Sequence, residues 1–440
     1  MTLETLEYTE ASLPPGSLGL PIVGESLEFI KNKNFISDHQ KKYGNIFITS
    51  LFGTPIVFVG GGDEVNFILS NENKFFQAFP VGNVKSLLGE YSLSLQTGET
   101  HLKRRKLILK AFSPRRLASY QETIHAITQS YINKWAKTDS FKWYDELRNY
   151  TFDIASKYLI SLDNGSETKL CEYFKSWSNG LFAIAPPLPF TKTRKSLVDR
   201  KKLIKLVDEI IQDRLSSSQT YDDALFHLMD AELEDGEKLS VEEVKHQILL
   251  LLFAGHETLT SSLCSLCRNL SLHPDILSRC KEEQSNIPHN PDINQSSMPY
   301  LDKVLLESMR IVPSVVSGFR KVLKECEIGG YKVEKGWLVF YQIDFTHYNK
   351  ETYPNPHSFN PENFNPAEHK ELVKSSNYIP FGGGVRECIG KDFAMLEMKI
   401  FASSLISQCD WELLPNQNLE YDLVPLPRPK DGLITKLRIN

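Results

Sequence analysis

The sequence predicts a mainly helical protein with small β-sheets, an α+β fold, and three observations carry this prediction. Short β-like runs bounded by Gly or Pro lie near the N-terminus, at 46–49 and 56–59. A helical pattern without proline then covers 241–273, inside a long stretch of helical composition. After that stretch, glycines and aromatic or β-branched runs such as 337–341 return. We therefore expect a small sheet, a large helical body, a second small sheet, and finally a loop that leads into a helix.

The chain contains no Gly/Ser linker, charge block or repeat, so its 440 residues are expected to form one domain. Apolar residues make up 41% and charged residues 24%, which is the composition of a globular protein with a sizeable core. This domain spans 1–440, with a β-rich part at about 14–100, a helical body at about 101–312, and strands and a cysteine loop at about 313–440.

Charge and cysteine content exclude several classes of protein. A net charge of −5 favours neither nucleic acid nor an anionic surface, so no nucleic-acid partner is expected. Seven irregularly spaced cysteines without a secretory signal favour the reducing cytosol over a disulfide framework. The longest apolar stretch, 248–255, falls short of the roughly 20 residues that span a bilayer. We expect a cytoplasmic monomer without a transmembrane anchor, for which peripheral contact with a membrane stays open.

The longest predicted helix is a natural wall for a buried site. Ser240 and Glu243 form a capping box, and the chain then has helical composition until Pro274. A helix of about 30 residues is roughly 45 Å long. Because residues 248–253 are apolar on nearly every side, this helix is expected to cross the middle of the domain.

A glycine-rich loop delivers one cysteine to the start of the last predicted helix, in the run Phe381-Gly-Gly-Gly-Val-Arg386-Glu-Cys388-Ile-Gly390. Backbone N–H groups and the positive end of the helix dipole lower a thiol pKa toward thiolate, the form that binds iron. The glycines allow a flat ligand to approach, Phe381 can shield the sulfur, and Arg386 can pair with a carboxylate. A lone cysteine is more often simply buried in a core. Here the neighbouring residues favour a ligand.

At average residue frequencies, a chain of this length would contain the same residues at five positions of this loop by chance with a probability on the order of 10⁻⁴. The five positions are Phe381, Gly384, Arg386, Cys388 and Gly390. The run closely resembles the cysteine-ligand loop of cytochromes P450. The resemblance implies the P450 fold, a triangular helical body whose long central helix crosses the haem site. It also implies haem b (iron protoporphyrin IX) with Cys388 as the axial iron ligand, and catalysis with O2 and electrons from an external redox partner.

A second motif lies in the long helix. The run Ala254-Gly255-His256-Glu257-Thr258 is similar to the oxygen-activation segment of the family. The resemblance implies that Ala254 and Gly255 border the haem, and that Glu257 and Thr258 are the catalytic acid–alcohol pair that handles protons. His256 is expected to be a packed helix residue rather than an iron ligand.

A third motif is structural. Glu307 and Arg310, at i and i+3, match the Glu-x-x-Arg pair that supports the cysteine loop in the family, although any helix can carry such an ion pair. The arginine that usually completes a triad with them is replaced by Asn363. Asn363 can still hydrogen-bond Glu307, so we expect some loss of stability rather than of chemistry.

The resemblance also assigns residues to the haem. His101 and Arg105, spaced i and i+4, match the helix that contacts the propionates, and Arg320 and Arg386 match the other propionate contacts. Phe381 and Gly390 complete this cofactor-binding set. The basic residues of the same helix are either a solvated face or a dock for a ferredoxin-type electron donor: Lys103, Arg104, Lys106 and Lys110.

Within the family, residues 249–260, 336–341 and 381–397 look most like a soluble cyanobacterial group related to animal retinoic-acid hydroxylases. This implies hydroxylation of a C–H bond in a small apolar substrate: a retinoid, an apocarotenoid or another terpenoid. Such side chains also build ordinary cores, but an apolar pocket is predicted from Phe182, Phe253, Val315 and Val316.

Other functions stay in view. A haem-thiolate isomerase or peroxygenase acting on fatty-acid-type substrates would need no electron donor, but such proteins often lose the acid–alcohol pair that Glu257 and Thr258 form here. A non-catalytic haem sensor or lipid carrier should lack Thr258 or carry a signalling domain. Cys264 and Cys267 form a C-x-x-C, but no second pair lies at zinc-site spacing, so they are not expected to bind metal.

Overall fold

The computed structural model describes residues 11–183, 188, 190–217, 219, 221–287, 292 and 297–440. Helices dominate and the strands form small sheets, which confirms the predicted fold class. Contacts divide the chain into two compact units that interleave in the sequence. The sheet unit comprises 1–79, 317–354 and 370–387, and the helical unit comprises 80–316, 355–369 and 388–440. Neither unit is a contiguous domain, because the β-rich segments from both ends of the chain meet in one of them.

The sheet unit contains one six-stranded sheet with the strand order β1-β2-β3-β9-β6-β4. The expectation of two separate sheets at the two ends of the chain was wrong for these strands. Val57 of β3 pairs in parallel with Val339 of β9. The backbone N–H and C=O groups of an N-terminal strand therefore form hydrogen bonds with a strand from the C-terminal part of the chain. The strands are β1 (Gly16–Ser17), β2 (Ile46–Leu51), β3 (Thr54–Val59), β4 (Phe76–Ala78), β6 (Ser317–Val322) and β9 (Leu338–Gln342), with a hairpin of β7 (Cys326–Ile328) and β8 (Tyr331–Val333).

The core of the sheet unit explains why this sheet forms. Val57, Val59 and Val339 are completely buried, together with Val65 and Ile68 of a helix that follows β3. β-branched side chains of this kind suit the pleated surface of a buried strand. The helices of the unit are α1 (Ser26–Lys31), α2 (Phe35–Tyr43), α3 (Gly62–Ser70) and α15 (Ile343–His347), with the 3-10 turn η4 (Gly384–Arg386).

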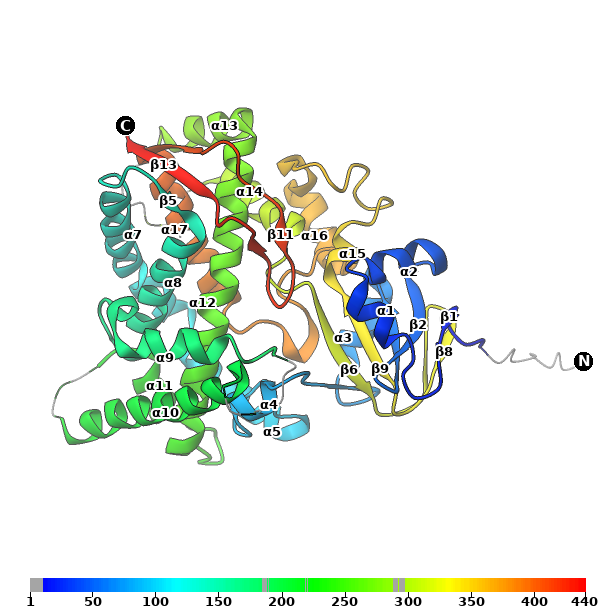
Figure 1. Ribbon diagram of the computed structural model, residues 1–440. Helices are drawn as coiled ribbons and strands as arrows, with labels where there is room; N and C mark the ends of the chain where they lie inside the picture. Colours follow the sequence, from blue (N-terminus) through cyan, green and yellow to red (C-terminus); the bar gives the residue numbers. More distant parts are fainter. Residues whose placement is uncertain are drawn as a thin grey trace, which may run out of the picture. The chain divides into compact units, whose positions relative to one another are not determined.

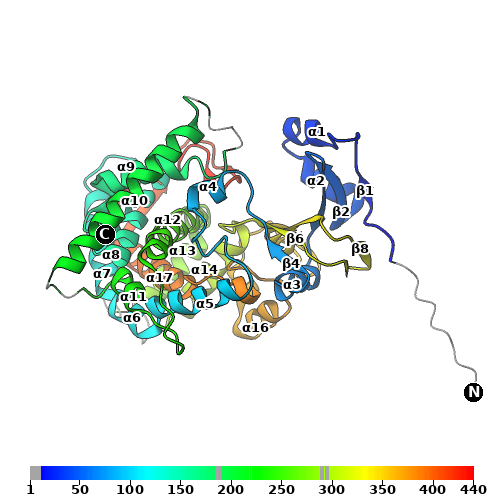
Figure 2. The same ribbon diagram turned by 90° about the horizontal axis from the view of Figure 1, so that it is seen from below.

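The helical unit is built around α12 (Val241–Leu272), the long helix predicted from the capping box. The box is present: the Ser240 side chain accepts from the Glu243 N–H, and the Glu243 carboxylate accepts from the Ser240 N–H. In Figures 1 and 2, α12 runs through the unit with other helices around it. It packs directly against α8 (Trp143–Ile160), α10 (Lys192–Ser216), α11 (Ala224–Asp230), α13 (Pro274–Gln284), α14 (Pro299–Ile311) and α17 (Lys391–Gln408).

Among the described residues, α12 is the one helix long and apolar enough to cross a bilayer, but 61% of its most apolar window is buried inside the protein. It is therefore a core helix of this unit. The remaining helices are α4 (Val84–Leu88), α5 (Gly98–Leu109), α6 (Pro114–Ser119), α7 (Gln121–Trp135) and α9 (Lys169–Ser178), and α16 (Pro366–Lys374) spans the boundary between the units.

Short strands and turns complete the helical unit. β10 (Cys409–Leu413) pairs with β13 (Ile434–Ile439), which also pairs with β5 (Phe141–Lys142). A two-stranded ribbon is formed by β11 (Tyr421–Asp422) and β12 (Arg428–Pro429). The 3-10 turns are η1 (Lys110–Phe112), η2 (Gly165–Glu167) and η3 (Pro361–Phe364).

Candidate active site

The predicted oxygen-activation segment, 254–258, forms slightly more than one turn of α12. Ala254 and Gly255 are exposed, and a side chain at Gly255 would meet no atom within 4 Å, so a flat ligand can approach the helix there. The Thr258 hydroxyl donates to the Ala254 carbonyl at 2.5 Å. The Ser314 hydroxyl donates to the Thr258 carbonyl at 2.7 Å, which places the segment of Val315 and Val316 beside this turn.

Glu257 is held in an ion pair that the sequence did not suggest. Its Oε1 lies 2.6 Å from Arg148 of α8 and accepts from the Ser178 hydroxyl at 3.3 Å. Burial opposes ionisation, but Arg148 and Ser178 outweigh it and hold the pKa of the Glu257 carboxyl below its usual range. Glu257 is therefore a carboxylate near neutral pH. Arg148 lies 109 residues away in the chain, so no local motif could have revealed this pair.

His256 is a packed residue, in agreement with the sequence-based expectation. It is fully buried, its Nδ1 is 2.8 Å from the Thr151 hydroxyl, and its ring meets Phe152 and Phe174 edge-on. Burial lowers the pKa of His256 to about 4, so the ring is neutral at pH 7. Its other neighbour is the Glu257 carboxylate, 3.8 Å from Nε2.

Cys388 differs from the other six cysteines, all of which lie within the described residues. It is exposed, whereas Cys326 is half-buried and the other five are buried. Burial raises the pKa of the Cys280 and Cys409 thiols to about 12, which keeps them protonated. Cys264 and Cys267 are likewise buried thiols of raised pKa on α12. No group of metal-binding residues occurs among the residues that the structure describes.

The cysteine loop crosses from the sheet unit into the helical unit at residue 388. Gly384 has φ +63°, and a Cβ there would lie 2.2 Å from the Leu69 carbonyl oxygen, so this position requires glycine. Phe381 is half-buried in the same part of the loop. On the other side of the crossing, Gly390 is the N-cap residue of α17, and a Cβ there would be 4.0 Å from the Cys388 sulfur. The thiol thus lies just before the N-terminus of an 18-residue helix.

Arg320 and Arg386, the predicted propionate contacts, share a carboxylate that sequence reasoning missed. Glu72 has 1% of its side chain exposed, with one oxygen 2.8 Å from Arg320 Nε and the other 2.5 Å from Arg386 Nε. Glu72 also accepts from the Ala78 N–H at 3.0 Å. Both guanidinium groups are therefore held in fixed positions within the sheet unit. A lone glutamate between Asn71 and Asn73 carries no local signal of this role.

His101 and Arg105 lie one turn apart on α5, His101 buried and Arg105 half-buried. The basic residues beside them are mostly engaged in the helical unit. Lys103 is 2.7 Å from Glu237, Arg104 pairs with Glu237 and Glu243, and Lys110 donates to the Glu232 carbonyl. Within the described part of the chain, Lys106 and Lys110 are the exposed members of the predicted docking set, and Lys106 is the one that forms neither an ion pair nor a side-chain hydrogen bond.

Glu307 and Arg310 form the predicted structural pair. Both side chains are completely buried, and Arg310 donates to both Glu307 oxygens at 2.7 and 2.8 Å. Arg310 also donates to the carbonyls of Pro356 and Ser358. The Asn363 amide donates to Glu307 at 3.3 Å, so the predicted hydrogen bond in place of the usual arginine is present.

A cavity of about 540 Å³ lies in the helical unit beside Glu257. Of the four predicted pocket residues, Phe182 and Phe253 line it, with ring centres 6.2 Å apart, whereas Val315 and Val316 do not. Residues 184–187 and 189, part of the segment after Phe182, lie outside the described residues. Charged groups also face the cavity: Arg148, Lys192, Lys195, Glu257 and Arg428.

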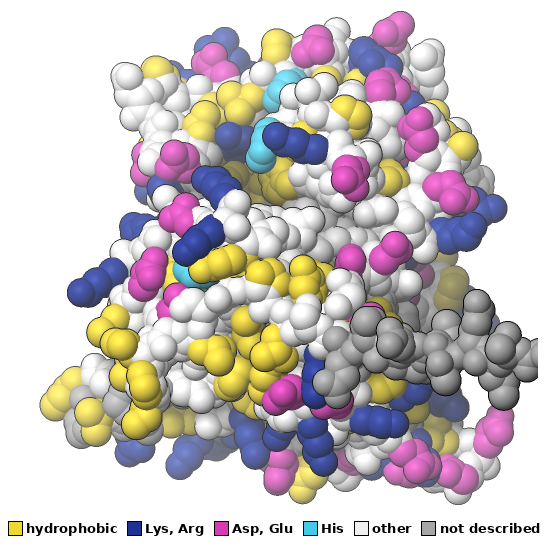
Figure 3. Space-filling model, turned by 90° about the vertical axis from the view of Figure 1, so that its right-hand side faces the viewer, with side chains coloured by type: hydrophobic (Ala, Val, Ile, Leu, Met, Phe, Trp, Pro, Cys, Tyr) yellow, Lys and Arg dark blue, Asp and Glu magenta, His cyan; other side chains and the backbone are white. Residues whose placement is uncertain are grey.

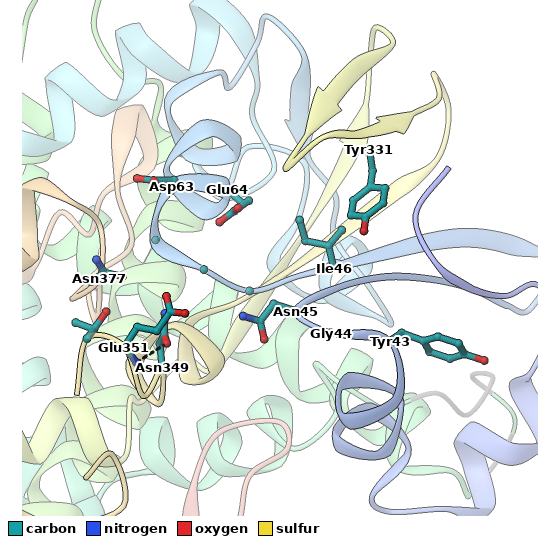
Figure 4. Close-up of a pocket in the computed structure, with 14 residues that line it drawn as sticks. Tyr43, Gly44, Asn45, Ile46, Asp63, Glu64, Tyr331, Asn349, Glu351 and Asn377 are labelled. Atoms are coloured by element: carbon teal, nitrogen blue, oxygen red, sulfur yellow. Dashed lines mark hydrogen bonds between the residues drawn. The ribbon is translucent and has the colours of Figure 1, made fainter. Parts of the chain in front are cut away.

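A second hollow, of about 460 Å³, lies in the sheet unit. Figure 4 shows Tyr43 and Tyr331 on one side of it and Asn349, Glu351 and Asn377 on the other. Its lining is polar, and none of the predicted site residues contributes to it. Of the two hollows, the one beside Glu257 is the one that predicted site residues line.

The residues predicted to hold haem fit that group. Cys388 supplies an exposed sulfur at a helix N-terminus, where a thiolate is favoured. Ala254 and Gly255 offer an open helix surface, and Arg320 and Arg386 are guanidinium groups suited to carboxylates.

Comparisons with known proteins identify the family of this chain. The family profile described as Cytochrome P450 matches residues 14–433. The chain is 42% identical to "Putative cytochrome P450 120" of Synechocystis sp., over 97% of this chain and 96% of that protein. It is 34% identical to "Cytochrome P450 26A1" of Danio rerio, over 96% and 90%. A solved structure titled "Retinoic acid bound cyanobacterial CYP120A1" superposes with a TM-score of 0.90 at 41% identity, covering 98% of this chain and 100% of that one.

The predicted resemblance to a cyanobacterial group and its animal relatives is thereby confirmed. Haem b, O2 and electrons from a redox partner follow from the family. The chain belongs to the cytochrome P450 family and is a haem-dependent monooxygenase.

Proposed function

We propose that this monooxygenase hydroxylates a C–H bond of a retinoid, or of an apocarotenoid or other terpenoid of similar size. One atom of O2 would enter the C–H bond, and the other would leave as water with two protons and two electrons from the donor. The observation that carries the proposal is the retinoic-acid-bound relative, which is 41% identical over nearly the whole chain. The aromatic walls of the cavity beside Glu257 support an apolar substrate.

Haem bound through Cys388 would supply the oxygen chemistry, and the chain's own residues would control protons and access. The Thr258 hydroxyl lies one residue from a carboxylate, and the pair fits the delivery of protons from the cavity. Phe182 and Phe253 would exclude water from the substrate's apolar body. His101, Arg105, Arg320, Arg386, Phe381 and Gly390 are proposed to bind the haem.

The test begins with a titration of the haem-loaded protein with all-trans-retinoic acid, observed as a shift of the Soret absorption band. We then expect turnover under ¹⁸O2 with a ferredoxin-type donor to yield a hydroxylated retinoid that carries one ¹⁸O atom. If no retinoid shifts the band, the retinoid assignment is refuted. A hydroxyl oxygen derived from water would refute direct insertion.

We propose that the electron donor approaches near Lys106, because the other three predicted docking residues already interact with the segment 232–243. Lys103 and Arg104 form ion pairs with its glutamates, and Lys110 donates a hydrogen bond to one of its backbone carbonyls. Lys106→Glu should slow reduction by a ferredoxin-type donor at low salt, where unscreened charges steer encounter. Lys137→Glu, a change at an exposed lysine of the helical unit outside the docking set, is the control. Equal slowing by both variants would contradict a specific role for Lys106.

We also propose peripheral contact with an anionic bilayer through an apolar patch of the sheet unit. Ile22 is 89% exposed and Phe52 is 63% exposed, and the two segments meet where the Phe52 N–H donates to the Ser26 hydroxyl. Figure 3 looks onto the side where α1 and α2 lie in Figure 1, with hydrophobic side chains exposed among basic and acidic ones. The patch consists of Leu18, Leu20, Ile22, Val23, Leu27, Ile30 and Phe52, followed by the exposed lysines Lys31, Lys33 and Lys42.

Apolar side chains next to lysines match the acyl boundary and the headgroups of an anionic membrane. Flotation with phosphatidylglycerol vesicles should recover the wild-type protein, and Ile22→Asp/Phe52→Asp should remain unbound. Phe226→Asp, a change at a 41% exposed phenylalanine of the helical unit, serves as the control. Wild-type protein that stays with the unbound fraction would refute this contact.

A further inference from the structure

The residues that line the cavity beside Glu257 carry more positive than negative charge. Four cationic residues line it, Arg148, Lys192, Lys195 and Arg428, but Glu257 is the one carboxylate among the lining residues. Glu257 is already paired with Arg148 at 2.6 Å, and Arg428 is 3.5 Å from Asp422. An excess of cations at a cavity favours an anionic ligand.

The two lysines are solvent-exposed members of this group that have no protein partner among the described residues. Across the described residues, neither Lys192 nor Lys195 forms an ion pair or a side-chain hydrogen bond. The nearest candidate on the same helix, Asp199, binds Lys202 instead at 2.9 Å. Both ammonium groups therefore remain available to a ligand.

The position of these lysines is electrostatically unfavourable for the protein itself. They lie in the first turn of α10, a 25-residue helix whose first turn contains no acidic residue. Cations at a helix N-terminus oppose the helix dipole, which favours anions there. A bound anion would relieve the repulsion among Lys192, Lys195 and the N–H groups of that turn. This second observation points to the same ligand charge as the cavity does.

The rest of the cavity selects an apolar body. Phe182 and Phe253 face each other across 6.2 Å, and Pro425 and Leu426 add further apolar surface. Phe253 and Glu257 lie one turn apart on α12 and both line the cavity, and Glu257 directly precedes Thr258. A free phosphate would use the lysines but none of the aromatic wall. A long apolar molecule with one carboxylate uses both.

We propose that Lys192 and Lys195 bind the carboxylate of an amphipathic acid whose apolar body lies against Phe182 and Phe253. The proposal deepens the proposed function and rests on it in one respect: it takes this cavity as part of the substrate pocket. In this proposal, the two lysines determine specificity, because they distinguish an acid from the corresponding alcohol or aldehyde. They would contact the end of the substrate remote from the oxidised carbon.

The test compares two acid–alcohol pairs, all-trans-retinoic acid with retinol and palmitic acid with hexadecanol. Binding is followed by the Soret shift and, independently, by quenching of tryptophan fluorescence. Lys192→Gln/Lys195→Gln should raise the Kd of the acids about tenfold, the loss of two partly exposed charge-assisted contacts, and leave the alcohols unchanged. Salt should weaken acid binding in the wild type and much less in this variant.

The matched control is Arg194→Gln/Lys201→Gln, which removes the same charge from the same helix at exposed positions that do not line the cavity. Equal weakening of acid binding by both double variants would overturn the proposal, since helix charge alone would then explain the effect. Weaker binding of the alcohols would also overturn it, because the lysines would then act on packing.

The outcomes separate this proposal from the proposed function. If retinoic acid binds well and the lysine variant does not change its Kd, the lysine site is refuted and the retinoid assignment stands. If neither retinoid binds but palmitic acid binds in a lysine-dependent way, the retinoid assignment fails and the acid site stands. Failure of both acids to bind more tightly than their alcohols refutes the acid site.

Discussion

Replacing Glu72 by glutamine would test whether one buried carboxylate holds the two arginines of the sheet unit. The Glu72 side chain is 1% exposed and lies 2.8 Å from Arg320 and 2.5 Å from Arg386, and these arginine side chains are 9% and 11% exposed. Glutamine has nearly the same shape as glutamate but carries no negative charge. Removing one member of a buried ion pair typically costs about 3–5 kcal/mol, because the remaining charge stays desolvated and uncompensated. Two guanidinium groups depend on Glu72, so we expect about 4 kcal/mol or more.

The assay is urea unfolding at 25 °C, followed by circular dichroism, with Asp63→Asn as the control. Asp63 is an exposed carboxylate in the same unit without an ion pair among the described residues, and its loss should change the free energy of unfolding by less than about 0.5 kcal/mol. If Glu72→Gln costs less than about 1 kcal/mol, the arginines are satisfied without Glu72, and the reasoning from burial is wrong.

Three further predictions concern the catalytic segment and the cysteine. Cys388→Ser should abolish the thiolate-type absorption spectrum of the reduced carbon monoxide complex; a spectrum that persists would show that another residue binds iron. Thr258→Ala should release more peroxide per electron consumed, measured as the ratio of peroxide to product, and unchanged coupling would contradict its role. His256 should make stability fall as the pH falls from 6.5 toward 4, because the unfolded chain then binds a proton that the buried ring, of pKa about 4, does not. Between pH 7 and pH 5 this loss is about 2 kcal/mol, and His256→Gln should show a correspondingly flatter profile in urea titrations at each pH.

Local patterns in the sequence were sufficient for the parts of the fold that depend on near neighbours. The Ser240–Glu243 capping box and the absence of proline up to Pro274 predicted α12 almost to its ends. The cysteine loop was recognisable because its residues act together within ten positions. Gly384 illustrates why: only glycine fits against the Leu69 carbonyl with a positive φ.

Long-range pairings were beyond the reach of such patterns. Nothing in the run 56–59 indicates that its partner is β9, almost 300 residues later, rather than another N-terminal strand. The same holds for the partners of the functional residues. Glu257 forms an ion pair with Arg148, and Glu72 forms ion pairs with both Arg320 and Arg386. From the sequence alone, each of these side chains would be expected to lie in solvent. The motifs identified the chemical groups, and the tertiary fold determined their protonation and orientation.

The Asn363 substitution shows how the fold can absorb a departure from the family pattern. Glu307 Oε2 accepts from Arg310, and Oε1 accepts from Arg310, the Asn360 N–H and the Asn363 amide. Neither oxygen is left without a donor, so the cost of an unsatisfied buried group does not arise. One carboxylate and one guanidinium also form a neutral buried pair, whereas a second arginine would add an uncompensated buried cation. The expected loss of stability is therefore limited to the difference between a charged and a neutral hydrogen bond at a single position.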